Sequence, residues 1–411
     1  MAPAKNLTMV MNAGSSSLKF KVFQALGNGE LESLASGLCE RIGDTANSRM
    51  KAKTAEGGSV TLQEGFSDHQ DALGLVSRFL ADTFSSSFTR SVHSVGHRVV
   101  HGLDISAPVL IDDGVKAVIE KAISLAPLHN PAGLQGIEAA MATFPAAPHV
   151  AVFDTAFHQT MAPAAYMYAL PKELYDEQAV RRYGFHGSSY KYLVPRAAKT
   201  LGKPVESLNA IICHLGAGSS MCAVRGGQSV DTTMGLTPLE GLVMGTRCGE
   251  LDRGDIDPAI VTYLLGQGHS GAEVDALLNK RSGFLGLTGH SDLRAVIDGA
   301  AAGSAPDRIA LDVWRHRIRK YIGAYALQMG GPLDALIFSA GIGENSSILR
   351  AFLLEGLEWY GIALDEESNK AAVDGVAGNI TAPGAKVQVL VIPTDEELSI
   401  AEQAIEVVDR T

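Results

Sequence analysis

The sequence predicts an α/β protein made of two related domains. Three observations lead to this prediction: strand-like apolar runs alternate with helix-like segments, a strand–turn–strand pattern at residues 10–22 recurs at 212–224, and the composition supports large cores. The chain has 411 residues, of which 46% are hydrophobic and 19% charged. A chain of this kind is long enough for two or three domains and is not disordered.

The first elements are strands followed by a helix. "LTMVMNAGSSSLKFKVFQA" predicts a strand, a turn and a second strand, and "LESLASGLCERI" predicts a third strand after the turn "LGNGE". Residues 67–85 have helical spacing, with apolar side chains at Leu73, Val76, Phe79 and Leu80.

The next segments continue the alternation. "VHSVGHRVVHG" is strand-like and ends at Gly102, and "GVKAVIEKAISLAPLHNP" predicts a helix that Pro127 and Pro131 terminate. "HVAVFDTAF" is a short apolar run bounded by turn residues, which is typical of a buried strand.

A second domain is predicted by the recurrence of the first hairpin. "VMNAGSSSLKFKV" aligns with "ICHLGAGSSMCAV", so that Gly14 matches Gly216 and Ser17 matches Ser219. A third Gly-rich turn, "FSAGIGENSSIL", follows the strand "LDALIF" and leads into a helix that Ser346 or Ser347 caps. Gly/Ser hairpins also recur by chance, so the duplication alone leaves both interpretations open. We place the domains at 1–155 and 156–395, with a C-terminal helix at 396–411 that packs back onto the first.

Composition excludes several classes of protein. A net charge of -11 argues against a nucleic-acid binder, which would need a basic face. The four cysteines lack C-x-x-C spacing, and no signal-type N-terminal segment or run of about 18 apolar residues occurs. We therefore expect a cytoplasmic protein without a membrane span.

The Gly-rich hairpins are candidate phosphate sites. Glycine turns expose successive backbone N–H groups that can bind anions, and Lys19 adds a positive charge. Tight hairpins also use Gly and Ser for steric reasons alone. Two such loops together with "GIGEN" favour a nucleotide site.

The segment "GHRVVHG" holds three polar side chains in an apolar strand. His97 and His101 are about 13 Å apart on a strand, too far to share one metal ion, so we expect structural histidines. Arg98 and Val100 point to the same face, which suits a short carboxylate with an aliphatic tail. An interdomain ion pair is the alternative for Arg98.

Other polar residues lie where elements end. His129 lies between prolines at the end of a helix, and Asp154 follows a buried strand, where it is either a reactive group or a helix cap. His186 lies in the Gly- and aromatic-rich "RRYGFHGSS", where neighbouring Arg181 and Arg182 would suit a phosphoryl site.

Two further segments are candidates for function. The irregular stretch 231–258 contains Pro238 and Arg247, and such long loops in a compact domain are usually functional. Asp395, Glu396 and Glu397 start a helix, where acids favour the macrodipole, and a Mg²⁺ ligand is the alternative role.

Taken together, the motifs resemble the acetate kinase family, which belongs to the superfamily of sugar kinases, heat-shock chaperones and actin. The matching stretches run nearly end to end: "NAGSSSLKF", "GHRVVHG", "PLHNP", "FDTAFH", "RRYGFHGSS", "HLGAGSS", "MGLTPLEGLVMGTR", "AGIGENS" and "PTDEEL". The resemblance implies two actin-like (ribonuclease H-like) domains flanking an active-site cleft. It implies nucleotide binding and homodimerisation through the C-terminal domain.

The resemblance also implies an activity, the reversible transfer of the ATP γ-phosphoryl group to acetate, which gives acetyl phosphate and ADP. The cofactor would be Mg²⁺, with Mn²⁺ as a substitute. The implied catalytic residues are Asp154, His186, Arg247 and Arg98. The implied substrate-binding residues are Arg98, Val100, Leu128, His129, Phe185 and Pro238. The implied ATP-binding residues are Lys19, His214, Leu215, Gly216, Ala217, Gly218, Asp292, Leu293, Arg294, Gly341, Ile342, Gly343, Glu344 and Asn345. The implied metal residues are Asn12 and Glu396.

Acetate is already ionised at neutral pH, so no general base is needed to activate it, and we expect Asp154 to orient an arginine or a metal-bound water. The alternatives are a propionate or butyrate kinase on the same fold, or an ATP-driven binding module of the actin kind. Two departures from the family pattern occur. Residues 250–254 are an insertion close to Arg247, and "TGHSDLR" is one residue shorter than usual at Asp292.

Overall fold

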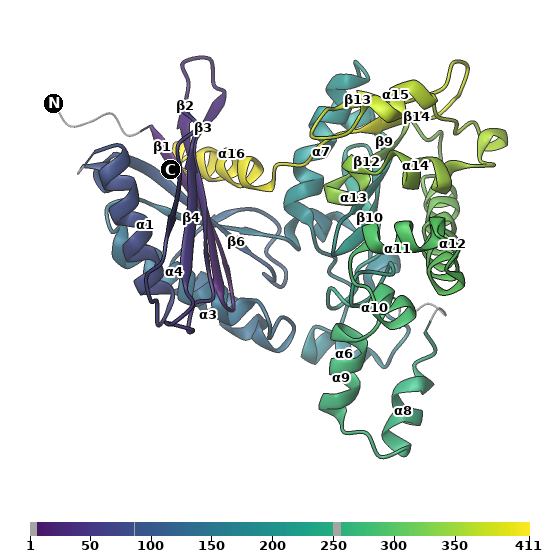
Figure 1. Cartoon of the computed structure of the whole chain (residues 1–411), viewed down its shortest axis with the longest axis horizontal. Coiled ribbons are helices and arrows are strands. Elements are labelled where there is room, and N and C mark those ends of the chain that lie inside the picture. The colour runs from purple at the N-terminus through teal and green to yellow at the C-terminus, as the bar shows by residue number, and fades with distance from the viewer. Residues whose placement is uncertain (1–5, 86, 250–255) are drawn as a thin grey trace. The chain divides into compact units, whose positions relative to one another are not determined.

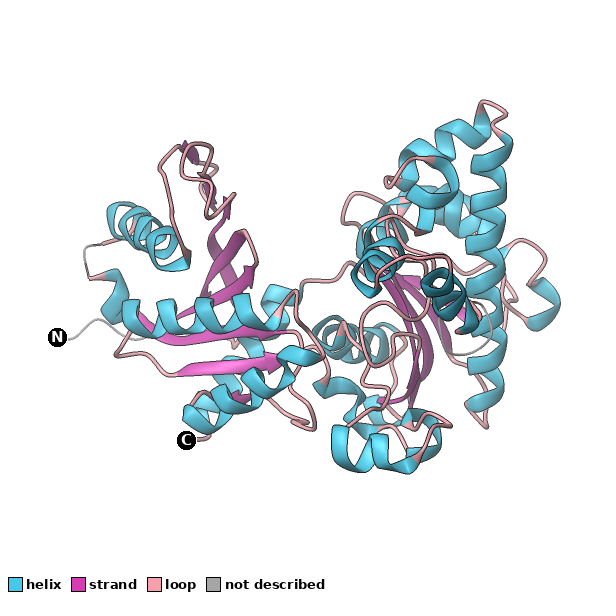
Figure 2. Ribbon diagram, turned by 90° about the horizontal axis from the view of Figure 1, so that it is seen from below, coloured by secondary structure: helices cyan, strands magenta, loops and turns pink. Residues whose placement is uncertain are grey.

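The computed structural model describes residues 6–85, 87–249 and 256–411. The chain divides into two compact units, unit 1 (residues 1–159 and 395–411) and unit 2 (residues 160–394). The sequence placed the first boundary at 155, whereas the chain leaves unit 1 after Gln159. Within each unit, helices flank a central sheet (Figures 1 and 2).

Unit 1 contains one mixed sheet in the strand order β5-β4-β3-β2-β1-β6-β8-β7. Its elements are β1 (Leu7–Gly14), β2 (Ser17–Ala25), β3 (Leu31–Glu40), β4 (Arg49–Thr54), β5 (Ser59–Leu62), α1 (His69–Thr83), α2 (Phe88–Ser91), β6 (Val92–Val99), β7 (Val109–Leu110), α3 (Asp113–Lys121), η1 (Ala122–Ser124), α4 (Asn130–Thr143), β8 (His149–Phe153), η2 (Ala156–Thr160), which runs into unit 2, and α16 (Glu396–Asp409).

Successive side chains of β1 point to opposite faces of the sheet, and each face is covered by different helices of unit 1. Met9 and Met11 belong to the core that α1 and α4 cover. Val10, between them, packs with Ile400 and Ala404 of α16 on the other face. The C-terminal helix therefore packs against the sheet of unit 1.

Unit 2 contains a sheet in the order β11-β10-β9-β12-β14-β13. Its elements are α5 (Pro163–Tyr166), α6 (Lys172–Gln178), α7 (Gly187–Thr200), η3 (Val205–Ser207), β9 (Asn209–Leu215), β10 (Ser219–Arg225), β11 (Gln228–Thr232), α8 (Ala259–Gly266), α9 (Gly271–Lys280), α10 (Gly283–Thr288), α11 (Leu293–Ala301), α12 (Ala305–Gln328), β12 (Ala335–Ser339), α13 (Ala340–Asn345), α14 (Ser347–Leu354), η4 (Glu358–Tyr360), α15 (Glu366–Ala371), β13 (Gly378–Asn379) and β14 (Gln388–Val391).

The two sheets repeat one pattern. In unit 1, β3, β2 and β1 are antiparallel, and β6 and β8 follow parallel to β1. In unit 2, β11, β10 and β9 are antiparallel, and β12 and β14 follow parallel to β9. Each β1–β2-type hairpin therefore turns at the carboxyl end of the parallel strands, where ligands of such sheets bind. The predicted α/β fold class is confirmed.

Two sequence-based expectations about local structure are wrong. Pro131 does not end a helix; it occupies the first turn of α4, where a missing N–H costs nothing, and His129 is therefore the residue that precedes a helix. The "AGIGEN" turn is itself the short helix α13, and Ser346 then caps α14 by accepting from the Leu349 N–H.

His97 and His149 form a buried hydrogen-bonded pair rather than a metal site. His149 Nε2 lies 3.2 Å from the Phe144 carbonyl, which only accepts, so the 2.9 Å bond between the rings must run from His97 Nε2 to His149 Nδ1. This arrangement is that of two neutral rings, the form that burial favours. Burial lowers the pKa of both histidines, and His149 lowers the pKa of His97 further.

Acid should destabilise unit 1 through this pair. Because the folded pKa values are lowered, the unfolded chain takes up protons below about pH 6.5 that the folded state excludes. Stability should fall by up to about 1.4 kcal/mol per pH unit for each histidine as the pH drops below that value. Thermal unfolding followed by circular dichroism from pH 7.5 to 5 would show this. The slope should persist in the exposed-site control His290→Gln and flatten in the double variant His97→Gln/His149→Gln; equal slopes would contradict the explanation.

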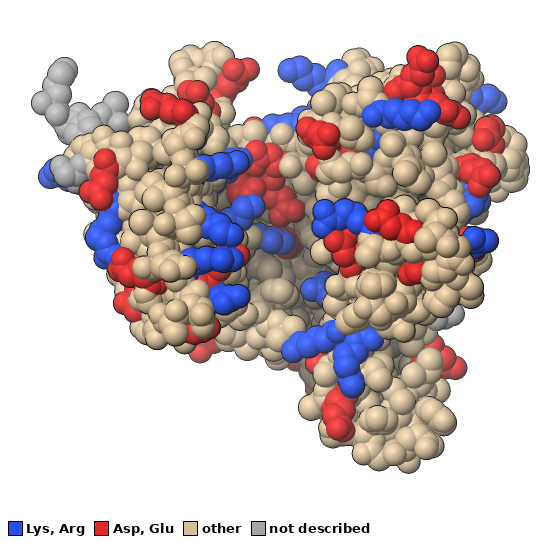
Figure 3. Space-filling model, in the orientation of Figure 1, with Lys and Arg blue, Asp and Glu red and all other residues tan. Residues whose placement is uncertain are grey.

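The charge distribution agrees with the acidic composition. On the face shown in Figure 3, Lys and Arg side chains are interspersed with Asp and Glu and form no continuous basic surface. Among the residues that the structure describes, no helix has both the length and the hydropathy to cross a bilayer.

Candidate functional site

Unit 1 places the first predicted residues on the β1–β2 hairpin. Asn12 lies directly opposite Lys19 in the register of the two strands. The Lys19 ammonium, which sequence analysis assigned to phosphate, forms an ion pair with Glu397. Lys19 remains about half exposed, with 52% of its side chain accessible, so this pair does not prevent contact with a ligand.

The acidic start of α16 is tied to unit 1 by three ion pairs. Asp395 caps the helix by accepting from the Leu398 N–H and lies 2.7 Å from Lys21 Nζ. Glu396 lies 3.8 Å from Arg98 Nε. Together with the Glu397–Lys19 pair, three consecutive acidic residues thus contact three different basic residues. A favourable interaction of acids with the helix macrodipole does not by itself predict these ion pairs.

Arg98 and Asp154 form a bidentate ion pair at the ends of adjacent parallel strands. Arg98 Nε donates to Asp154 Oδ1 at 3.0 Å and Nη2 donates to Oδ2 at 2.7 Å. Burial opposes the charge on Arg98, but Asp154 and Glu396 outweigh it, so the pKa of Arg98 lies above its usual value. Burial raises the pKa of Asp154, although Arg98 opposes this shift. The Asp154 carboxylate is therefore bonded to the Arg98 guanidinium through both of its oxygens.

The residues predicted for the methyl pocket fall in both units. Val100 directly follows β6 and is half-buried, and Leu128 is 54% exposed ahead of α4. In unit 2, Phe185 is buried and Pro238 is half-buried. His129 precedes α4 and its side chain does not cap that helix.

In unit 2, two predicted histidines stack beside the β9–β10 turn. The rings of His186 and His214 are 4.1 Å apart and inclined by 22°. His186 adopts a left-handed conformation, with φ of 59°, as the residue before α7. A Cβ atom built on Gly218 would lie 3.7 Å from His186 Nε2 and 3.9 Å from Arg247 Nη1. The turn of the second hairpin thus lies between an imidazole and a guanidinium.

Arg247 is the charged group of this cluster without a carboxylate. Its Nη1 donates to the Pro238 carbonyl at 3.3 Å and approaches Met244 Sδ at 3.9 Å, and within the described part of the chain no salt bridge involves it. Burial lowers the pKa of Arg247. A half-buried guanidinium that contacts only neutral atoms is suited to an anionic ligand.

Arg181 and Arg182 do not join the cluster, contrary to the sequence-based expectation. Arg182 is buried, forms an ion pair with Glu240 and donates to the carbonyls of residues 232–234. The guanidinium of Arg181 stacks on Tyr166, 3.7 Å from the ring centroid. Arg182 therefore supports the loop that leads to Arg247, whereas Arg181 packs on the ring of Tyr166.

Two residues that sequence analysis did not select support His186. Ser220 Oγ lies 2.8 Å from His186 Nδ1 and 2.5 Å from the Tyr190 hydroxyl. Ser220 lies within the quoted motif "HLGAGSS", and Tyr190 directly follows "RRYGFHGSS" in the first turn of α7. A Ser beside a Gly-rich turn gives no signal of its partner. On the other ring, His214 Nδ1 lies 2.9 Å from Ser189 Oγ.

The residues predicted to bind adenosine lie at two helix starts. Asp292 caps α11 by accepting from the Arg294 N–H, and its carboxylate also pairs with the Arg294 side chain at 2.6 Å. Leu293 is buried. Residues 341–345 lie within α13, and a Cβ atom on Gly216 would lie 3.7 Å from Ala340 Cβ, so α13 adjoins the β9–β10 turn.

Glu344 has a structural role in this helix. Its Oε1 accepts from the N–H groups of Ala340 at 2.6 Å and Thr394 at 2.9 Å. Ala340 has a positive φ of 64°, which is unusual for a residue with a Cβ atom and is held by this bond. The carboxylate therefore fixes the start of α13.

No preformed metal cluster is seen. Across residues 6–85, 87–249 and 256–411, no three His, Cys, Asp or Glu side chains gather in a group able to hold an ion. The candidates Asn12 and Glu396 both offer oxygen ligands in unit 1. The insertion 250–254 lies outside the described residues.

The duplicated topology, with Gly-rich turns at the carboxyl ends of the parallel strands, is that of the actin-like fold, which several phosphotransferases share. A sequence profile of the acetokinase family matches residues 7–402, and the chain belongs to this family. The sequence-based assignment to the family is thereby confirmed, as is its enzyme class, a kinase.

Similar proteins agree with this assignment. The chain is 50% identical to "Acetate kinase" of Leifsonia xyli over 97% of its length and 98% of the relative's. It is 47% identical to "Acetate kinase" of Methanosarcina thermophila, over 98% and 97% of the two chains. The crystal structure of Porphyromonas gingivalis acetate kinase superposes with a TM-score of 0.90 at 38% identity, covering 98% of this chain and 99% of that one. A propionate kinase from Francisella tularensis superposes with a TM-score of 0.88, also at 38% identity and with the same coverage.

Proposed function

We propose that this kinase transfers the γ-phosphoryl group of ATP to acetate, giving acetyl phosphate and ADP, and catalyses the reverse reaction. The observation that carries the proposal is Arg247, a half-buried guanidinium beside the Gly218 turn and the His186 ring with no carboxylate partner among the described residues. Phosphoryl transfer is mostly positioning and charge stabilisation, and a site of this kind stabilises charge in flight.

The residues of unit 1 act on the carboxylate. Arg98 binds the acetate carboxylate, and Asp154 holds the guanidinium by the two hydrogen bonds at 3.0 and 2.7 Å. We assign the methyl group of acetate to Val100, Leu128, Phe185 and Pro238, and His129 lies next to Leu128 in the chain.

The residues of unit 2 act on the nucleotide. The turn 214–218 contacts phosphates, and residues 292–294 and 341–345 hold adenosine. Lys19 of unit 1 is a further phosphate contact. Because Asp292 and Glu344 are already bonded within unit 2, we assign their contribution to backbone placement. Arg247 and His186 stabilise the phosphoryl group during transfer.

The residues present fit a Mg²⁺ ion. Asn12 and Glu396 supply an amide and a carboxylate oxygen, and Mg²⁺ typically takes one or two protein ligands and keeps several waters. When bound, the ion would neutralise charge on the β- and γ-phosphates. Asn12 lies opposite Lys19 on the hairpin and Glu396 lies 3.8 Å from Arg98 Nε, both within unit 1.

Propionate is the second candidate acceptor, since a propionate kinase is among the similar structures. Val100 narrows the pocket more than alanine would, which favours acetate. One methylene is worth about 10–200-fold in discrimination, so some propionate turnover is expected.

The test is to trap acyl phosphate with hydroxylamine after incubation with Mg-ATP and acetate, propionate or butyrate. We expect the highest kcat/KM with acetate, and about tenfold higher propionate activity in the Val100→Ala variant. If none of the three acids gives an acyl hydroxamate, the kinase proposal is refuted. If the wild type has a higher kcat/KM with propionate than with acetate, propionate is the acceptor instead.

We further propose a homodimer in the cytoplasm. The cytoplasm is supported by the four cysteines, which are all free. Light scattering of the purified chain tests the dimer, and a mass of about 43 kDa would contradict it.

A further inference from the structure

We propose that His69 is a positioning residue that holds the turn of the first hairpin in the geometry needed for phosphoryl transfer. The inference rests on the proposed function, because it assigns the turn at residues 14–16 a part in binding. His69 is the first residue of α1 and belongs to none of the motifs that the sequence analysis selected as functional.

The contact is a single buried hydrogen bond across the unit. His69 is 4% exposed, and its Nε2 lies 2.9 Å from the carbonyl oxygen of Gly14, the last residue of β1. A carbonyl only accepts, so the ring must carry its proton on Nε2 and donate it. Because the helix is capped by Asp68 accepting from Asp71, the side chain of His69 is not needed to start α1.

The turn has few other supports. The Ile42 N–H donates to the Ser16 carbonyl at 3.0 Å. On the α4 side, the backbone approaches so closely that a Cβ atom on Gly136 would lie 2.5 Å from Ala13 Cβ. Ser15 and Ser16 are exposed, so their hydroxyl and N–H groups face solvent rather than the core.

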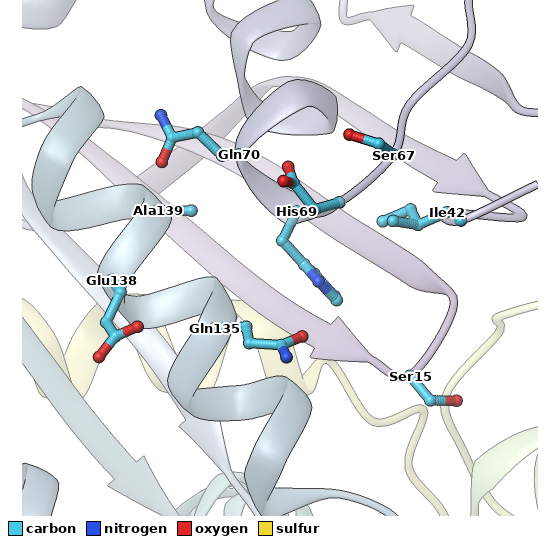
Figure 4. Close-up of a pocket in the computed structure, with 10 residues that line it drawn as sticks. Ser15, Ile42, Ser67, His69, Gln70, Gln135, Glu138 and Ala139 are labelled. Carbon is cyan, nitrogen blue, oxygen red and sulfur yellow. The ribbon is translucent and has the colours of Figure 1, made fainter. Parts of the chain in front are cut away.

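A cavity of about 520 Å³ lies next to the turn, and His69 is one of the residues that line it. The cavity is lined by Ser15, Ile42, Gln135 and Glu138 with the start of α1. Figure 4 shows the His69 ring projecting from α1 between Gln135 and the turn that carries Ser15. Since open space adjoins the turn here, removing the imidazole leaves nothing on this side to hold the Gly14 carbonyl.

The hairpin links this turn to the reacting groups of unit 1. Asn12 and Lys19 face each other two residues from the strand ends, and Lys19 pairs with Glu397. A displacement of the turn would therefore move the proposed metal and phosphate contacts together. Misplacement of reacting groups by about 1 Å can cost about 10²-fold in rate.

A matched pair of variants tests the hydrogen bond itself. The amide nitrogen of glutamine occupies the place of His Nε2, whereas that of asparagine occupies the place of Nδ1. We expect His69→Gln to retain kcat within about threefold of the wild type, and His69→Asn and His69→Ala to lose about 10–100-fold. The KM for acetate should change less than kcat, and all three variants should unfold within a few degrees of each other.

Hydrogen exchange measured by mass spectrometry provides a readout independent of activity. Peptides covering residues 11–20 and 40–45 should exchange faster in the Asn and Ala variants and at the wild-type rate in the Gln variant. Unchanged exchange in His69→Ala, or equal kcat values for the Gln and Asn variants, would overturn the inference. If the wild type makes no acyl phosphate, both the proposed function and the catalytic role of His69 are refuted. If the wild type turns over normally and His69→Ala has an unchanged kcat, only the role of His69 is refuted.

Discussion

Alanine in place of Arg247 is expected to lower kcat for acetyl phosphate formation by about 10²–10³-fold, the usual effect of removing one group that stabilises a transition state. The reason is the position of the guanidinium, which a Cβ atom on Gly218 would approach to 3.9 Å. Among the residues that the structure describes, it contacts neutral atoms of Pro238 and Met244 and no carboxylate. Burial lowers the pKa of Arg247 and so disfavours its charge, which offsets the loss of the hydrogen bond to Pro238, and we expect the unfolding temperature to change by only a few degrees.

The control is Arg281→Ala, which removes an exposed guanidinium of the same unit whose Nη2 lies 3.4 Å from the Glu273 carbonyl. It should leave kcat unchanged. Arg247→Lys should recover only part of the loss, because an ammonium lacks the planar pair of donors. Added guanidinium should partly restore Arg247→Ala but not affect the wild type. Turnover of Arg247→Ala within threefold of the wild type would contradict the assignment.

The strand-level prediction from sequence succeeded because its signals are local. Period-two alternation along β1 and β2 and the Gly/Ser turn between them predict a hairpin, and the same pattern returns in β9 and β10. The helix start at the acidic residues 395–397 is likewise predicted from neighbouring residues, and the structure shows that Asp395 caps this helix. Pro131 misled because a proline that ends one helix and a proline that starts the next look alike in sequence.

The contacts of the site could be predicted only in part. The motifs pointed to Arg98 and Asp154 separately, but their bond joins residues 56 apart and follows from the parallel pairing of β6 with β8. His69 gave no signal because its partner, the Gly14 carbonyl, is a backbone atom in another element. Arg182 looked like a phosphate ligand because sequence does not show that Glu240 neutralises it.

Asparagine in place of Asp154 is expected to lower kcat/KM for acetate by about 10²-fold, mainly through KM, while the shape of the pH–rate profile is unchanged. Asp154 is buried and holds Arg98 by two hydrogen bonds. The amide keeps one acceptor oxygen, so Arg98 stays nearby but loses its fixed orientation and the charge that compensates its burial. An interaction with the substrate carboxylate would then be weakened in both ground and transition states.

The competing explanation makes Asp154 a general base, and the two differ in two measurable ways. A base predicts loss of kcat in Asp154→Asn with little change in KM, and disappearance of the acidic limb of the pH–rate profile. An orienting residue predicts that Arg98→Ala has as large an effect as Asp154→Asn, and that the double variant is little worse than either single one, because the two side chains act as a unit. The general-base role would be established, and the orienting role refuted, by two results together. The losses of kcat/KM in the two single variants would add up in the double variant, and the acidic limb of the pH–rate profile would vanish in Asp154→Asn but not in Arg98→Ala. Since acetate is already ionised at neutral pH and has no proton to give, we expect the non-additive result.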